Sequence, residues 1–94
     1  MIYVRICYDN PGAFDLRLKH REERQEFLKK EGQVRIVQAG PLCAGDDNGT
    51  YVGTLMLVDA PSREAVVAFH DDDPFTRVGV FERHFITRYD KHIG

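Results

Sequence analysis

The chain has 94 residues, 43% of them apolar and 30% charged, a composition typical of one ordinary globular domain. Thirteen basic and fifteen acidic side chains leave a net charge of −2, so no positive field favours nucleic-acid binding. No stretch approaches the ~18 apolar residues of a membrane span, and the N-terminal segment lacks the basic lead and cleavage site of a signal peptide. We therefore expect a single domain over residues 1–94, located in the cytoplasm and without a membrane partner.

The two cysteines, Cys7 and Cys43, are too few and too widely spaced for a disulfide framework or a zinc site of paired thiolates. We expect each of them to be a small buried residue.

The first predicted element is a strand over residues 2–8, in which apolar and more polar residues alternate. Its more polar side carries Tyr3, Arg5 and Cys7, which we assign to a semi-polar outer face of the sheet. A turn follows at residues 9–12, and the next breaker-free segment predicts one helix over residues 14–31.

The remaining elements follow in order. A second strand begins near Val34 and ends at residues 39–41, and a turn-rich connection over 45–49 leads into a third strand over 51–58. Ser62 is the expected N-cap of a second helix, which the acidic run at 71–74 interrupts. The last strand covers residues 80–89.

This order predicts an α+β fold, a ferredoxin-like βαββαβ domain with an antiparallel sheet and both helices on one face. Strands two and three should be antiparallel neighbours. The uncovered face must meet water or a partner, and a second sheet packed face to face is the simplest cover, which predicts a homodimer.

The first helix carries a row of basic residues on the face that turns Phe27 and Leu28 toward the core. Residues three and four apart share a helix face, which places His20 and three arginines together: Arg17, Arg21 and Arg24. A planar guanidinium can donate two parallel hydrogen bonds to a carboxylate or phosphate, so this row favours a small anionic ligand. The alternative is that the arginines extend into solvent or pair with nearby acidic residues, including those at 71–73.

Other polar residues indicate less. His70 and the three aspartates that follow it invite the idea of a metal site, but adjacent residues project in different directions, so we expect a solvated loop and no metal. His84 and His92 are expected to be structural. Tyr8 could bring its hydroxyl to the same cleft as the arginines, and core packing explains it equally well. No phosphate loop, nucleophile elbow or dinucleotide fingerprint is present, so no cofactor is expected.

The chain resembles the YciI-like (YCII-related) family nearly from end to end. Five short motifs in the same order carry the resemblance: Asp9-Asn10-Pro11-Gly12, Leu16-Arg17-Leu18 with Arg21, Ala39-Gly40-Pro41-Leu42, Gly53-Thr54-Leu55, and Asp73-Pro74-Phe75 followed by Gly79. The resemblance implies a ferredoxin-like fold whose sheets pair in a dimeric α/β barrel. It also implies a small-molecule enzyme, and one branch of the family removes chloride from a chlorinated hydroxyhydroquinone.

In that family a helix histidine and the aspartate of the Asp-Pro pair are regarded as catalytic partners. Asp73 matches the aspartate, but the histidine position falls on Arg24 here, and an arginine cannot act as a general base near neutral pH. His20 lies one helical turn earlier. Our hypothesis is that His20 transfers the proton and Asp73 orients it, while Arg17, Arg21 and Arg24 hold the substrate.

Three interpretations follow from the sequence. The first is a cofactor-free lyase, isomerase or dehydrohalogenase that acts on a small anionic or aromatic compound, with His20, Arg24 and Asp73 together in one pocket. The second is a non-catalytic anion-binding or accessory protein that lost its base when arginine replaced the family's histidine. The third is a dimerisation module, which would require internally paired arginines and no cleft.

Overall fold

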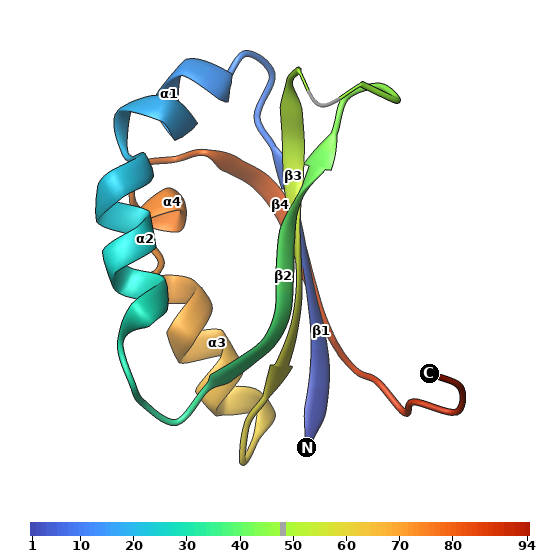
Figure 1. Cartoon of the computed structure of the whole chain (residues 1–94). Coiled ribbons are helices and arrows are strands. Elements are labelled where there is room, and N and C mark those ends of the chain that lie inside the picture. Colours follow the sequence, from blue (N-terminus) through green and yellow to red (C-terminus); the bar gives the residue numbers. More distant parts are fainter. Residues whose placement is uncertain (48) are drawn as a thin grey trace.

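The computed structural model describes residues 1–47 and 49–94. These residues form four strands and four helices, and the helices all lie on the same face of one sheet (Figure 1). The elements in chain order are β1 (Ile2–Asp9), α1 (Phe14–Lys19), α2 (Arg21–Lys29), β2 (Arg35–Cys43), β3 (Tyr51–Asp59), α3 (Arg63–Asp72), α4 (Pro74–Arg77) and β4 (Phe81–Arg88). The sheet is antiparallel with strand order β2-β3-β1-β4, so the predicted ferredoxin-like α+β fold is confirmed.

The central strand β1 turns its more polar side inward, which makes our assignment of the outer face wrong. Tyr3, Arg5 and Cys7 are all at least 96% buried, and in the register of the sheet they pair with buried residues of β3. The polar side chain of Arg5 is not exposed to solvent, because its guanidinium binds buried side chains beneath the helices.

The core lies between this inner face and the helices. Its main cluster joins β1, β3 and β4 to α3 and consists of Tyr3, Met56, Val58, Ala60, Ala65, Val66 and Ile86. A smaller cluster of Ala13, Phe75 and Val80 closes the end of the sheet where α1 and α4 lie. Cys7 is buried as expected, whereas Cys43 is exposed, because it ends the edge strand β2 beyond the cover of the helices.

The predicted first helix is in fact two helices, and the break falls at His20. This residue has φ −104° and ψ 15°, which ends α1 and begins α2 although no glycine or proline is nearby. Arg17 before the break and Arg24 after it are each bound to a different buried carboxylate, Asp9 and Asp73. The helix therefore bends at His20, between two tertiary ion pairs, and no local signal in the sequence predicts this bend.

Strand β2 extends two residues beyond its predicted end, through the Gly40-Pro41 pair to Cys43. Proline is tolerated there because β2 is an edge strand, which does not need every N–H for pairing. The pairing of β2 with β3 is antiparallel, as predicted. The predicted turn over 45–49 includes Asn48, which lies outside the described residues.

The second half of the helical layer is divided at Asp73. Ser62 caps α3 as predicted, since its hydroxyl accepts a hydrogen bond from the Ala65 N–H at 3.2 Å. Asp73 then caps α4, accepting from the Phe75 N–H at 2.9 Å, and Pro74 occupies the first helical position. The predicted interruption of the second helix is thus confirmed. The residue at the break, Asp73, has a buried side chain and does not belong to the solvated loop that we expected.

No helix of the described residues lies on the opposite face of the sheet (Figure 1). The register brings five apolar side chains together on that face: Val4, Ile6, Leu55, Leu57 and Phe85. Phe85 is 50% exposed, which is unusual for a large aromatic residue at the middle of a strand. No helix in the described part of the chain is long and apolar enough to cross a bilayer.

Candidate functional site

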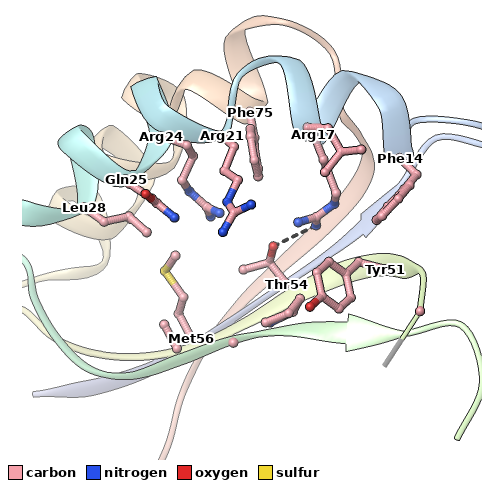
Figure 2. A pocket seen from close by; sticks show the side chains of 15 residues that line it. Phe14, Arg17, Arg21, Arg24, Gln25, Leu28, Tyr51, Thr54, Met56 and Phe75 are labelled. Atoms are coloured by element: carbon pink, nitrogen blue, oxygen red, sulfur yellow. Dashed lines mark hydrogen bonds between the residues drawn. The ribbon is translucent and has the colours of Figure 1, made fainter. Parts of the chain in front are cut away.

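A pocket of about 470 Å³ lies between helices α1 and α2 and the inner face of β2 and β3 (Figure 2). Its described lining combines three arginines with aromatic and apolar residues: Phe14, Arg17, Leu18, Arg21, Arg24, Gln25, Leu28, Ala39, Gly40, Pro41, Gly49, Tyr51, Thr54, Met56 and Phe75. This volume is within the range that holds small-molecule ligands in proteins. The helices therefore leave a ligand-sized space over one half of the sheet.

Arg17 is fixed at one end of the pocket. Its guanidinium makes two hydrogen bonds to the Asp9 carboxylate, one of them at 2.9 Å, and a third to Thr54 Oγ1 at 2.9 Å. The side chains of Arg17 and Asp9 are only 7% and 5% exposed. Bidentate pairing of this kind is geometrically specific, so Arg17 is held as a rigid part of the wall.

Arg24 is held from behind by Asp73. Its Nη2 donates to Asp73 Oδ2 at 3.1 Å, and its guanidinium lies over the Phe75 ring at 4.4 Å from the centroid. Burial lowers the pKa of Arg24, and the charge of Asp73 opposes that shift. The Nε–H of Arg24 is buried and has no partner among the described residues. A buried donor without an acceptor is costly, and here it belongs to a side chain that lines the pocket.

Behind the pocket lies a buried polar network centred on Asp73. Arg5 donates to Asp73 Oδ2 at 2.9 Å, so two guanidiniums share one carboxylate oxygen. Arg5 also donates to His70 Nδ1 from Nε at 3.0 Å and from Nη2 at 2.8 Å. A nitrogen that accepts from arginine carries no proton, and burial together with the Arg5 charge lowers the pKa of His70 to about 4. His70 is therefore neutral near pH 7.

The charges of this region do not cancel. Three guanidiniums (Arg5, Arg17, Arg24) and two carboxylates (Asp9, Asp73) have side chains no more than 9% exposed, which leaves one buried positive charge in excess. Arg21 is exposed, makes no hydrogen bond or ion pair with a described residue, and points into the same space (Figure 2). Uncompensated buried charge is unfavourable, so the excess positive charge is a feature of this region that its described residues do not neutralise.

The structure brings together part of the predicted site. Arg17, Arg21 and Arg24 line one pocket, whereas His20 and Asp73 are not among its described lining residues. Asp73 makes its hydrogen bonds with Arg5, Arg24 and the Phe75 N–H, and none with His20. His20 instead lies 3.9 Å from the Glu23 carboxylate. The expected pocket holding His20, Arg24 and Asp73 together is therefore not observed.

Tyr8 lies on the other side of the sheet. It follows the inward-facing Cys7, and the Arg83 guanidinium lies 4.5 Å from the centre of its ring. Since neighbouring strand residues point to opposite faces, the Tyr8 side chain points away from the pocket.

The pairing of Arg24 with Asp73 fits the predicted alternative in which arginines find acidic partners. That alternative accounts for only part of the row, because the cleft is present and Arg21 has no described partner. Among the described residues, no group of three or more acidic, histidine or cysteine side chains is placed to hold a metal ion.

Sequence reasoning missed Arg5, Thr54, Tyr51 and Phe75. An arginine inside an alternating strand was a usable signal for Arg5, because a charge on the buried side of a strand needs a partner. The other three lie on β3 and α4, far in sequence from the arginines of α1 and α2. Only the packing of these helices on β3 brings them to the same pocket.

Comparisons with known proteins agree with this architecture. The sequence model of the YCII-related domain matches residues 1–90. Protein YciI of Escherichia coli O6:H1 is 31% identical over 98 aligned positions, which cover 97% of this chain and 98% of that protein, and Protein YciI of Shigella flexneri matches with the same values.

Two solved structures share the fold. The first is 5-chloro-2-hydroxyhydroquinone dehydrochlorinase (TftG) from Burkholderia phenoliruptrix AC1100, in complex with 2,5-dihydroxybenzoquinone. It has a TM-score of 0.85 and 24% identity, with 98% of this chain and 96% of that chain covered. The second is a NIPSNAP domain protein from Burkholderia xenovorans, with a TM-score of 0.51, 12% identity, and coverage of 99% and 97%. The match of the domain model over nearly the whole chain shows that this protein belongs to the YCII-related family.

Proposed function

We propose that the protein binds a small, planar anion in the arginine-lined pocket and acts on it as a cofactor-free lyase, isomerase or dehydrohalogenase. The observation that carries the proposal is the buried Nε–H of Arg24, which has no described acceptor and belongs to a region with excess positive charge. A carboxylate, phenolate or enolate oxygen would both accept a hydrogen bond from this N–H and neutralise the excess positive charge.

The walls favour a flat ligand. Phe14, Tyr51 and Phe75 line the pocket with aromatic surface, and Arg17 and Arg24 both lie over the Phe75 ring, 5.1 and 4.4 Å from its centroid. A single aromatic or quinonoid ring could stack on such surfaces while its oxygens face the guanidiniums. The structural neighbour that binds 2,5-dihydroxybenzoquinone supports this ligand class by analogy of fold.

Guanidiniums at a developing oxyanion are also a means of catalysis. Proton transfer or loss of halide from a hydroxylated ring passes through species with extra negative charge on oxygen, and preorganised cations stabilise that charge. In this proposal Asp73 acts as a positioning residue, because it holds Arg24 against the pocket and caps α4.

A second candidate is a non-catalytic anion-binding protein. It is favoured by one observation, that neither His20 nor Asp73 is among the described residues lining the pocket. Both candidates require the anion, and they differ in whether the bound compound is changed. The earlier hypothesis that His20 transfers the proton stays a proposal, and its test is turnover by a His20→Gln variant.

The proposed binding can be tested with 2,5-dihydroxybenzoquinone as the probe, measured by calorimetry and by the visible absorbance of the quinone. We expect the native protein to bind it and Arg24→Gln to weaken binding by about 10–100-fold, the value of one or two charge-assisted hydrogen bonds. Arg77→Gln is the matched control, since the exposed Arg77 of α4 forms its ion pair, among the described residues, with the exposed Asp72 of α3.

Equal binding by the native protein and Arg24→Gln would refute the proposal, as would no binding by the native protein. Chloride release from 5-chloro-2-hydroxyhydroquinone separates the two candidates. Release that Arg24→Gln abolishes supports the enzyme, and binding without any release supports the non-catalytic protein.

The proposal includes a homodimer formed through the uncovered face of the sheet. Val4, Ile6, Leu55, Leu57 and Phe85 form an apolar surface there, and a second copy of the same face is a self-complementary cover. Sedimentation equilibrium should give twice the chain mass of 10.8 kDa. A monomer at micromolar concentration would contradict the dimer and leave the pocket proposal unaffected.

A further inference from the structure

The proposed reaction needs a group that can give and take a proton, and the pocket offers little choice. The described lining contains no histidine, aspartate, glutamate, lysine or cysteine. Its three arginines stay charged and cannot act as bases near neutral pH. The nearby carboxylates of Asp9 and Asp73 are held by guanidiniums, and neutral His70 uses its Nδ1 to accept from Arg5. The arginines can bind a ligand but cannot take its proton, and the two carboxylates and the His70 Nδ1 are already occupied by arginines.

Tyr51 remains as an ionisable side chain on the wall. It begins β3 and lines the pocket from the sheet side, opposite the helices that carry the arginines (Figure 2). Its ring meets Phe14 edge to face, with centroids 5.9 Å apart, which fixes the ring between α1 and β3.

The Tyr51 hydroxyl makes no hydrogen bond with any described residue, although the ring is half-buried. Thr54 is the other hydroxyl of the described lining, and its oxygen already accepts from Arg17 at 2.9 Å. A phenol both donates and accepts hydrogen bonds, and this one shares the pocket wall with the three arginines that would bind the ligand. The unpartnered hydroxyl is therefore placed to exchange a proton with a bound ligand.

On this basis, and resting on the proposed function, we infer that Tyr51 is the proton-transfer residue of the pocket. For a bound hydroxylated ring, the Tyr51 O–H bond breaks and the adjacent ring C=C π bond breaks with it. The π electrons form a new C–H bond to the Tyr51 proton, at the carbon next to the one that carries the ionised oxygen. The electron pair of that oxygen becomes a carbonyl π bond, and the tyrosinate keeps the electrons of its O–H bond. In the reverse step the tyrosinate removes a proton from the same carbon, so no oxidant or cofactor takes part.

The step predicts exchange of ring hydrogen with solvent. The probe is 1,2,4-trihydroxybenzene, kept reduced under argon in D₂O, with loss of its ring C–H signals followed by NMR. We expect the native protein to accelerate the exchange and Tyr51→Phe to slow the catalysed rate by about 10²–10⁴, the usual contribution of a general acid or base. The dissociation constant for the probe should change by less than about tenfold, because one neutral hydrogen bond is lost.

Two controls make the result specific. Tyr89→Phe removes the hydroxyl of an exposed tyrosine after β4, away from the pocket, and should exchange at the native rate. His20→Gln tests the competing assignment of the proton to the α1–α2 junction.

Each outcome decides the inference. Slow exchange with retained binding in Tyr51→Phe supports it. Native exchange in that variant overturns it, and slow exchange in His20→Gln alone assigns the proton to His20. If the native protein binds the probe without accelerating exchange, the inference fails while anion binding stands. If the native protein does not bind the probe, the inference fails, and calorimetry with 2,5-dihydroxybenzoquinone shows whether the binding proposal fails as well.

Discussion

Replacing Asp73 by asparagine isolates the charge of the buried network. Asp73 is fully buried and accepts three hydrogen bonds, from Arg5, Arg24 and the N–H of Phe75. Asparagine keeps the size of the side chain and is as good an N-cap as aspartate, so the start of α4 is preserved. What changes is that two buried guanidiniums lose their shared carboxylate.

The expected loss of stability is large. Breaking a buried ion pair by removing one partner costs about 3–5 kcal/mol, because an uncompensated charge stays in the interior. In a domain of this size each kcal/mol corresponds to roughly 4–8 °C in Tm, so we expect Asp73→Asn to melt roughly 12–40 °C lower. The total stability of small domains is on the order of 5–15 kcal/mol, so the variant can be partly unfolded at room temperature.

Urea titration followed by circular dichroism measures this change. Asp72→Asn is the matched control. The Asp72 side chain is 64% exposed and pairs with Arg77, so this substitution should lower the free energy of unfolding by no more than about 1 kcal/mol. Adding Arg24→Gln to Asp73→Asn removes one of the two unpaired cations, so the double variant should be more stable than Asp73→Asn alone. A loss below about 1 kcal/mol, or no recovery in the double variant, would refute the charge argument.

Two further predictions concern other parts of the fold. Because burial and Arg5 lower the pKa of His70 to about 4 from 6.5, the unfolded chain takes up this proton first as the pH falls. Its contribution, up to roughly 3 kcal/mol, should be fully present above pH 6.5 and lost between 6.5 and about 4. The pH dependence of urea unfolding should be flatter in His70→Gln, and an unchanged slope would contradict this. Gly53→Ala should destabilise by roughly 1–3 kcal/mol, because a Cβ at Gly53 would lie 2.4 Å from the Cys7 carbonyl oxygen and force β3 away from β1; native stability would show that the strands adjust.

The candidate site was partly predictable from the spacing of the arginines. Residues 17, 21 and 24 recur at helical intervals, and the three do line one pocket even though the helix bends between them. The proposed partnership of His20 and Asp73 was not confirmed by the geometry. Spacing on one helix says which residues share a face, but it does not say which of them a distant carboxylate will bind, and Asp73 binds Arg24.

The order of strands and helices, and with it the ferredoxin-like fold, was determined by the sequence alone, because alternation and turn residues are local signals. The direction in which β1 faces was decided only by the tertiary structure. Tyr3, Arg5 and Cys7 are more polar than their neighbours, yet they face the helices, since Asp73 and His70 supply buried partners to Arg5. A charged side chain is buried or exposed according to its partners, and partners 65 or more residues away are known only once the chain has folded.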